Sequence, residues 1–381
     1  MGLGNRPRAL DTVLLTTALD RVLEHEPADL TATVEAGIPL GELNARLERQ
    51  GQFLPLEAPE PGRATIGGLL ATAWTGPRRL RYGPARDWVI GLKAALPDGT
   101  LARSGGKVVK NVAGYDLAKL HIGGLGTLGV IAEVSFKVLP LPAARATIAA
   151  GFGRLQDATS FGGGVLAGGL RPTALELLNA AALAHLGPQA PLLSAYHLAL
   201  VEFAGAPTAV TRQIDDAARL ARESQAGSVT VLDGAPAAGL WQAVLLLGQQ
   251  AESKPFMSTR ATVLPATVER CLEAHAALGR EHALAPAVVG GLGTGVVQAH
   301  WWPAGGGPAL ADSSVRHIVD VLVRECQACS GALVVTHAPP AVKAWLDIWG
   351  SAPAALALMR TLKQQFDPTG TLNPGRFVGG I

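Results

Sequence analysis

The amino-acid sequence predicts an α+β protein with two larger domains. Segments whose apolar residues alternate with polar ones, as in half-buried strands, are interspersed with segments whose apolar residues recur every three or four positions, as in helices. A proline-rich break at 139–142 (LPLP) separates two stretches that both carry this mixture. The length of 381 residues is enough for two domains, each with its own core.

The first stretch contains three clear strands and one clear helix. Residues 29–36 (DLTATVEA) are rich in β-branched residues and predict a strand. Residues 40–50 predict a helix whose leucines lie on one face and which Gly51 ends. Strands are also expected at 88–96, before a tight Asp-Gly turn, and at 130–138, where apolar and polar residues alternate.

The second stretch repeats the mixture with longer helices. The glycine-rich segment 290–295 lies between two short β-branched runs and predicts a hairpin. We expect one domain at 1–142, a second at 143–352, and a C-terminal helix with its tail at 353–381. The elements expected after residue 142 are strands at 143–151, 228–232 and 296–302, and helices at 207–226, 237–248, 267–278, 313–330 and 354–366.

Composition excludes several classes of protein. The 32 basic and 30 acidic residues leave a net charge of +2, which gives no support for nucleic acid as the main partner. No apolar run approaches the length that spans a bilayer, and the first seven residues lack the apolar stretch of a secretory signal. The three cysteines are too few and too uneven for a disulfide framework, so we expect a cytoplasmic protein.

One glycine motif matches a dinucleotide fingerprint but lies in the wrong context. Residues 124–129 (GLGTLG) fit the G-x-G-x-x-G pattern, which needs a helix after it because the helix N-terminus holds the pyrophosphate. The residues that follow alternate with period two and predict a strand instead. A Rossmann site is therefore not expected at this position.

Two further segments bring glycines and polar residues together. Residues 64–69 (ATIGGL) form either a simple turn or a place where backbone N–H groups approach phosphate oxygens. Residues 105–117 (GGKVVKNVAGYDL) form a loop whose lysines either neutralise an anion or are solvated. For each segment taken alone, both interpretations stay open.

In combination, six short strings are far more specific than any one of them. They occur in this order: TIGG at 65–68, GPRR at 76–79, RDWVIG at 86–91, KNVAGYDL at 110–117, GTLGVIAE at 126–133 and FDPTGTLNPGR at 366–376. The series resembles the vanillyl-alcohol-oxidase (PCMH) type of FAD-linked oxidoreductase. The strings at 76–79 and 110–117 are similar to those of the FAD-binding subunits of bacterial glycolate oxidases.

The resemblance implies a two-subdomain FAD-binding domain of the PCMH type, followed by an α+β cap domain on the substrate side. The C-terminal tail would return to the flavin domain. A βαβ unit with a glycine-rich loop precedes the corresponding segment in the family, so we expect such a unit to be missing before Met1. The implied FAD contacts are Thr65, Ile66, Gly67 and Gly68 on the pyrophosphate and ribityl chain, Gly114, Tyr115 and Asp116 beside the isoalloxazine, Gly129, Val130 and Ile131 near the adenosine half, and Asn373 in the returning tail.

The resemblance also implies an activity and partners. These are oxidation of a 2-hydroxy acid, glycolate to glyoxylate, with FAD as electron acceptor, in a complex with a catalytic FAD subunit and an iron–sulfur subunit. Such partners would hold the chain at the inner face of the membrane. Two alternatives stay open: a non-catalytic structural subunit of that complex, and an independent FAD-linked dehydrogenase acting, for example, on D-lactate.

No catalytic residue and no metal ligand is assigned from the sequence. The Gly-Glu-His-Gly string of catalytic relatives is absent from 330–337, where His337 stands alone and is expected to be structural. The single C-x-x-C at 326–329 lies in an expected helix, which favours a pair of helical thiols over a zinc site. The arginines of 78–86 form a solvated loop, a phosphate contact or a docking face for a partner subunit.

Overall fold

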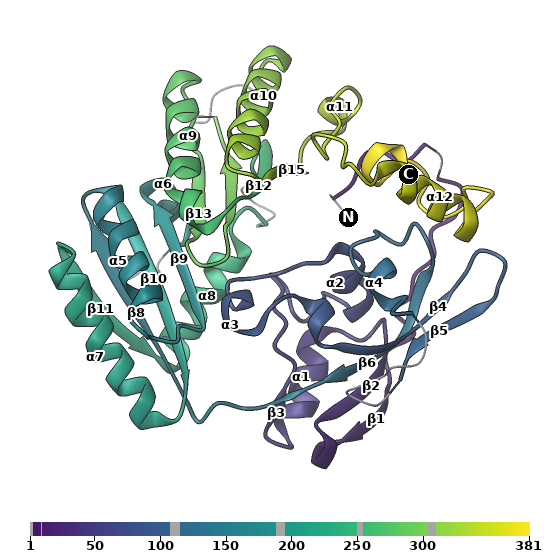
Figure 1. The fold of residues 1–381 in the computed structure, drawn as a ribbon, viewed down its shortest axis with the longest axis horizontal. Helices are drawn as coiled ribbons and strands as arrows, with labels where there is room; N and C mark the ends of the chain where they lie inside the picture. Colours follow the sequence, from purple (N-terminus) through teal and green to yellow (C-terminus); the bar gives the residue numbers. More distant parts are fainter. Residues whose placement is uncertain (1–2, 9, 107–114, 188–194, 250–253, 304–309) are drawn as a thin grey trace. The chain divides into compact units, whose positions relative to one another are not determined.

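The computed structural model describes residues 3–8, 10–106, 115–187, 195–249, 254–303 and 310–381 (Figure 1). The chain forms two compact units. The smaller unit comprises residues 3–76, 83–141 and 352–381, and the larger unit comprises 77–82 and 142–351. Both units combine helices with antiparallel sheets, which confirms the predicted α+β class.

The smaller unit is built on one antiparallel sheet. Within the described residues its strand order is β1-β2-β6-β4-β5, and neighbouring strands are antiparallel throughout. A second, two-stranded sheet pairs β3 with β7. The elements are β1 (Val22–Glu26), β2 (Thr31–Glu35), α1 (Leu40–Glu48), β3 (Gln52–Phe53), α2 (Ile66–Thr72), β4 (Val89–Ala95), β5 (Leu101–Gly105), α4 (Ala118–His121), β6 (Val130–Lys137), β7 (Leu139–Pro140) and α12 (Leu356–Phe366).

The core of the smaller unit follows the predicted patterns with one departure. Helix α1 buries all three of its leucines, as their spacing predicts. Strand β6 was expected to alternate strictly, yet Ile131 is buried together with Val134 and Phe136. A register shift between Lys93 and Ala94 of β4 explains this, because a bulge changes which residues of the partner strand face inward.

The larger unit is built on a wider antiparallel sheet. In the part of the chain that is described, its strand order is β11-β8-β10-β9-β13-β14-β12-β15. Strands β13 and β14 form the hairpin expected around 290–295. The strands are β8 (Ala144–Phe152), β9 (Ala174–Asn179), β10 (His197–Gly205), β11 (Ser228–Asp233), β12 (Met257–Thr262), β13 (Ala287–Gly291), β14 (Val296–Trp301) and β15 (Ala332–His337).

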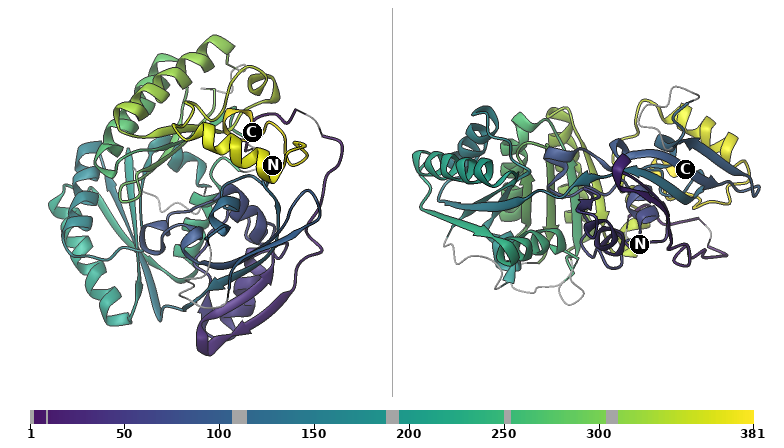
Figure 2. Two further views of the ribbon diagram at one scale, coloured as in Figure 1. Left: turned by 45° about the vertical axis from the view of Figure 1, so that its right-hand side comes forward. Right: turned by 90° about the horizontal axis from the view of Figure 1, so that it is seen from below.

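Helices cover both faces of this sheet (Figure 2). Helices α5, α7, α9 and α10 pack on the face that carries Phe203 and Trp301, while α6 and α8 pack on the face that carries Leu200 and Thr147. The helices are α3 (Arg79–Tyr82), α5 (Leu155–Ala167), α6 (Ala180–His185), α7 (Pro207–Glu223), α8 (Gly234–Leu246), α9 (Val268–Glu281), α10 (Asp312–Ala328) and α11 (Pro340–Lys343).

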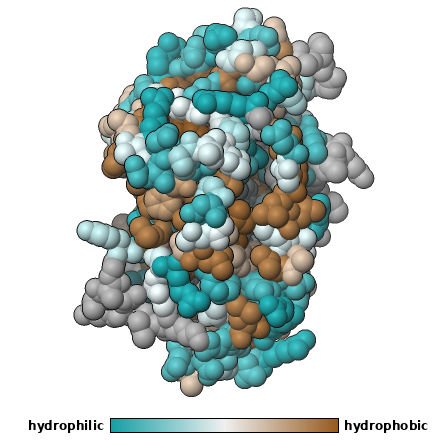
Figure 3. All heavy atoms as spheres, turned by 90° about the vertical axis from the view of Figure 1, so that its right-hand side faces the viewer, coloured by the Kyte–Doolittle hydropathy of each residue, from teal (hydrophilic) through white to brown (hydrophobic). Residues whose placement is uncertain are grey.

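Hydrophobic and hydrophilic side chains are mixed on the surface that Figure 3 shows. The face drawn in Figure 3 carries hydrophobic side chains in small groups among hydrophilic ones. Exposed apolar side chains also occur in the segment 10–15, where Leu10, Val13, Leu14 and Leu15 are each more than half exposed. No helix within the described ranges is long and apolar enough to cross a bilayer.

Candidate functional site

The predicted contact at Thr65–Gly68 is the first turn of helix α2. Thr65 is its N-cap, and the hydroxyl oxygen accepts a hydrogen bond from the N–H of Gly68 at 3.2 Å. The N–H groups of Ile66 and Gly67 donate to the carbonyls of Ile38 and Ala36 at 3.0 and 2.6 Å. A Cβ on Gly67 would lie 3.0 Å from Ala36, so glycine lets the helix start against the end of β2. Of these residues, Gly68 and Thr65 are the ones left to contact a ligand, and that contact stays a prediction.

The other end of helix α2 is joined to the glycine turn at 123–127. The N–H groups of Gly123 and Leu125 donate to the carbonyls of Leu70 and Ala71 at 2.8 and 2.9 Å. Leu125 and Gly126 both have positive φ, and strand β6 follows directly. The prediction that this motif is a turn before a strand, and not a Rossmann loop, is confirmed.

Asn373 clamps this turn from the C-terminal tail. Its side-chain amide donates to the carbonyl of Leu125 at 2.7 Å, and Asn373 itself adopts a left-handed conformation with φ of 45°. A Cβ on Gly126 would lie 3.1 Å from that amide nitrogen. The structure therefore gives Asn373 a positioning role, and direct contact with a cofactor stays a prediction.

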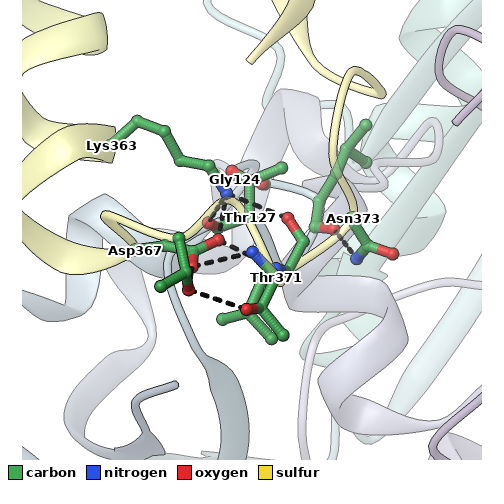
Figure 4. A network of polar contacts seen from close by, with 9 residues as sticks. Gly124, Thr127, Lys363, Asp367, Thr371 and Asn373 are labelled. Carbon is green, nitrogen blue, oxygen red and sulfur yellow. Dashed lines mark hydrogen bonds and ion pairs between the residues drawn. The ribbon is translucent and has the colours of Figure 1, made fainter. Parts of the chain in front are cut away.

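A buried ion pair secures the same tail (Figure 4). The Lys363 ammonium lies 2.5 Å from the Asp367 carboxylate and donates to the carbonyls of Thr127 and Leu372 at 2.8 and 2.9 Å. The Asp367 carboxylate also accepts from the N–H groups of Thr371 and Leu372 at 2.9 and 2.8 Å. The side chain of Asp367 is fully buried and that of Lys363 is 13% exposed. One pair thus closes the tail and joins it to the turn.

A buried histidine explains the glycine at position 129. A Cβ on Gly129 would lie 2.9 Å from Cε1 of His121 and 3.2 Å from the carbonyl of Ala95. The His121 ring meets Phe366 of α12 edge-on, with ring centroids 6.4 Å apart. Burial lowers the pKa of His121, so the ring is neutral at neutral pH. Its Nδ1 is buried and has no hydrogen-bond partner in the described residues.

The predicted residues after Gly129 begin strand β6. Val130 and Ile131 pair with Ala95 and Ala94, and the Ile131 side chain is buried in the core. Gly129, which precedes them, lies against His121 and follows the turn that Asn373 holds. Helix α2 connects that turn to Thr65–Gly68 at its other end. A cofactor contact at these residues stays a prediction.

The predicted flavin-side loop is only partly described. Gly114 lies outside the described residues. Tyr115 is 92% exposed, and Asp116 pairs with Lys119 at 2.7 Å on the surface. The structure does not join Tyr115 or Asp116 to the cluster around Gly129 by any contact it gives. Their predicted place beside the isoalloxazine therefore remains untested.

The larger unit carries a polar cluster that the sequence analysis only partly anticipated. Arg78 binds Glu202 of β10 through two hydrogen bonds of 2.9 and 2.8 Å, and the Glu202 side chain is 4% exposed. This bidentate pair accounts for the membership of residues 77–82 in the larger unit. Arg78 is therefore not part of a solvated loop. One feature of the sequence could have pointed to Glu202: it is the one carboxylate in the otherwise apolar strand 197–205 (HLALVEFAG).

The same face of the sheet carries Arg260. Strand registers place Arg260 of β12 opposite Gln298 of β14, on the face that also carries Glu202 and Glu176. Burial, and next the charge of Arg79, lowers the pKa of Arg260 to about 10, so the group stays protonated at neutral pH. Two neighbouring guanidinium groups in a partly desolvated place favour an anion such as a carboxylate.

The cysteines of 326–329 and His337 lie at the ends of secondary-structure elements, and their structural role stays a prediction. Cys326 is in the last turn of α10, Cys329 caps it, and both are buried free thiols. His337 ends strand β15, and burial lowers its pKa. His300 is buried beside Ser258, with Nδ1 and Oγ 2.9 Å apart, and burial lowers its pKa to about 4.

Two family models match this chain. Residues 3–105 match the model described as "FAD binding domain", and residues 141–377 match the model described as "FAD linked oxidases, C-terminal domain". The second match alone covers more than half of the chain.

Curated proteins similar to the chain include several hydroxy-acid enzymes. The chain is 33% identical over 229 residues to glycolate oxidase subunit GlcD of Bacillus subtilis, and 46% identical over 124 residues to glycolate oxidase subunit GlcE of Escherichia coli. It is 30% identical over 386 residues to D-2-hydroxyglutarate dehydrogenase of Xanthomonas citri pv. viticola. These matches cover 59%, 32% and 96% of this chain, and 49%, 35% and 79% of the respective relatives. The first two therefore span half or less of the relatives' length.

Solved structures share the fold at low sequence identity. Alkyldihydroxyacetonephosphate synthase superposes with a TM-score of 0.67 and 16% identity, covering 95% of this chain and 68% of that one. 4-Ethylphenol oxidase from Gulosibacter chungangensis gives 0.67 and 15% identity, covering 94% and 78%. At these identities the likeness shows the fold alone.

We expect loss of the buried pair to destabilise the smaller unit. Replacing Lys363 by Met leaves the Asp367 carboxylate buried without its ammonium partner, which costs about 3 kcal/mol of unfolding free energy. The measurement is urea unfolding of the full chain. The matched control is Arg63→Met, which removes an exposed pair with Glu60 and should change stability by less than about 1 kcal/mol. Equal stability of the Lys363→Met variant and the wild type would contradict the role given to this pair.

We also expect a specific pH dependence from Asp367. Burial alone would raise the pKa of Asp367, but the hydrogen bonds from Lys363, Leu372 and Thr371 outweigh it and lower that pKa. The pair therefore stabilises the fold fully above the unfolded-state pKa of about 3.9, and this contribution is lost as the pH falls through the lower folded-state value. The measurement is the unfolding midpoint as the pH is lowered below about 4. As the pH falls, the midpoint of Asp367→Asn should decrease less than that of the wild type. If both midpoints decrease in parallel, the pKa of Asp367 is the same in the folded and unfolded states.

Proposed function

Because the chain belongs to the FAD linked oxidases, we propose that it takes part in oxidising a 2-hydroxy acid, with FAD held by the domain at residues 3–105. The observation that carries the substrate class is the match to D-2-hydroxyglutarate dehydrogenase, which extends over 96% of this chain. The glycolate and D-lactate enzymes among the partial matches are likewise named for 2-hydroxy acids. FAD supplies the electron-accepting ring of such a reaction.

The residues of the smaller unit fit a bound dinucleotide. Nδ1 of His121 and Nε1 of Trp74 are buried and lack hydrogen-bond partners in the described part of the chain, and a polar ligand would satisfy them. Among the described residues, chain neighbours aside, no atom lies within 4 Å of the position of a Cβ on Gly106, and for Gly68 the Thr65 hydroxyl is the one such atom. These open glycine positions let a ligand approach the backbone closely. Thr65, Gly68, His121 and Trp74 are the residues that would hold it.

The sheet face of the larger unit that carries Glu202 and Arg260 supports binding of a carboxylate substrate. Every 2-hydroxy acid carries a carboxylate, and Arg260 together with Arg79 provides a positive, partly desolvated place for one. Arg78 is occupied by Glu202, so its role is to hold the segment 77–82 on the sheet and thereby position Arg79. Arg260 would bind the carboxylate of the substrate, and Arg78 would hold Arg79 in position.

The finer proposal is a FAD-binding subunit of a glycolate oxidase-like complex. The 46% identity to GlcE over 124 residues supports it. In that setting the chain would work beside a catalytic FAD subunit and an iron–sulfur subunit, and these partners would bring it to the inner face of the membrane. An independent dehydrogenase is the second candidate, favoured by the nearly full-length match to the D-2-hydroxyglutarate enzyme.

The proposed reaction is tested by mixing the flavin-loaded chain with 2-hydroxy acids in the absence of oxygen. We expect glycolate, D-lactate or D-2-hydroxyglutarate to bleach the flavin absorbance, either with the chain alone or with co-purified partners. Bleaching by the chain alone would identify an independent dehydrogenase. Bound flavin that none of the three acids reduces, with or without partners, would rule out the proposed oxidation.

Arg260 is expected to affect binding of the acid and not of FAD. Arg260→Met removes a charged hydrogen-bond donor worth about 1.5–3 kcal/mol, so affinity for the acid should fall about tenfold or more. The measurement is calorimetric titration of the flavin-loaded chain with the acid. Arg219→Met, which removes an exposed arginine paired with Asp216, is the control. Unchanged affinity in Arg260→Met would exclude Arg260 as the carboxylate ligand.

A further inference from the structure

Two helices of the larger unit bring a glutamate and two histidines together, away from the polar sheet face. Helix α9 ends at Glu281 and His282 caps it, while His317 lies in the second turn of α10. The Glu281 carboxylate oxygen lies 3.1 Å from Nε2 of His317 and 3.9 Å from Nε2 of His282. One ligand atom from each of the three residues lies within 4.8 Å of the other two.

One of these ligand atoms, Nε2 of His282, is buried without a hydrogen bond among the described residues. A buried polar atom left in this way costs free energy, and a coordinated cation would recover it. The other two side chains, Glu281 and His317, are 56% and 45% exposed. The cluster is therefore closed on one side and open to an ion and its water on the other.

The surrounding structure holds the three residues in place. Helices α9 and α10 lie side by side (Figure 1), and a second contact joins them where Arg270 binds Glu325 at 3.0 Å. The N–H of His282 donates to the carbonyl of Leu278 at 3.0 Å, and Leu284 bonds back to Gly279 at 2.8 Å. The C-terminal end of a helix carries a partial negative charge, which favours a cation at the end of α9.

We propose that Glu281, His282 and His317 bind a divalent transition-metal ion of the zinc class. Two imidazoles and one carboxylate are a donor set that zinc accepts, with a further position left for water. Tetrahedral zinc with bonds of about 2.1 Å separates its ligand atoms by about 3.4 Å. The Glu281–His317 distance of 3.1 Å is close to this value. The ligand atom of His282 has to approach Glu281 by about 0.5 Å, and it has to approach His317, now within 4.8 Å, to the same separation. The ion ties the end of α9 to α10.

The test is zinc binding by the full chain without a histidine tag. The chain is freed of metal with a chelator and dialysed against zinc, and bound zinc per chain is counted by mass spectrometry. We expect one ion per chain and a higher unfolding temperature with zinc. His317→Gln and Glu281→Gln, both at exposed positions, should each weaken binding by at least about tenfold. The matched control is His25→Gln, in strand β1 of the smaller unit, where zinc binding should be unchanged.

Several results would overturn the site. The wild-type chain could take up no stoichiometric zinc, or His317→Gln and Glu281→Gln could bind it as the wild type does. Zinc retained in His317→Gln but lost in Cys326→Ser would place the ion at the thiols instead. Because this experiment reads zinc content and unfolding temperature, its outcome is independent of the proposed oxidation.

Discussion

The buried pair between Lys363 and Asp367 is the interaction on which the candidate flavin site depends. It fixes a tail that is more than 200 residues away in sequence from the turn it holds. The ammonium bonds to the carbonyl of Thr127, and the carboxylate shapes residues 371–373, so that Asn373 reaches Leu125. A pair this deeply buried is costly to form unless all its hydrogen bonds are made, and here both partners are fully engaged. The arrangement of the tail and turn is therefore determined as one unit.

A comparable constraint organises the larger unit. Glu202 is a carboxylate inside an otherwise apolar strand, and it is stable there because Arg78 supplies a bidentate partner. That bond draws residues 77–82 onto the larger sheet, although the residues on either side of them belong to the smaller unit. Leu80 adds packing, since a Cβ on Gly293 would lie only 2.5 Å from its Cδ1. The two units are thus connected by chain crossings at 76–83, near 141 and near 351.

Sequence reasoning worked best where one local pattern decides the structure. The helices α1 and α7, the hairpin β13–β14 and the strand after residue 129 follow from apolar periodicity and glycine placement alone. Prediction from the sequence failed where a residue's structure depends on residues that are distant in the chain. Residues 64–69 were interpreted as a simple turn or a phosphate-binding segment, whereas they begin helix α2, and the N–H groups of Ile66 and Gly67 bond to the carbonyls of residues 38 and 36. The sequence analysis missed Arg260, Glu202 and the Glu281–His282–His317 cluster. These side chains come close to their neighbours only when strands and helices that are distant in sequence pack together.

The central claim is that the smaller unit holds FAD at helix α2 and the residues around Gly129. The most direct measurement is hydrogen–deuterium exchange of the full chain, with and without FAD. The account predicts slower exchange in residues 65–72, 121–131 and 367–376 on binding, with little change in the strands of the larger sheet. Flavin that binds stoichiometrically without protecting these segments would contradict it, as would a chain that binds no flavin.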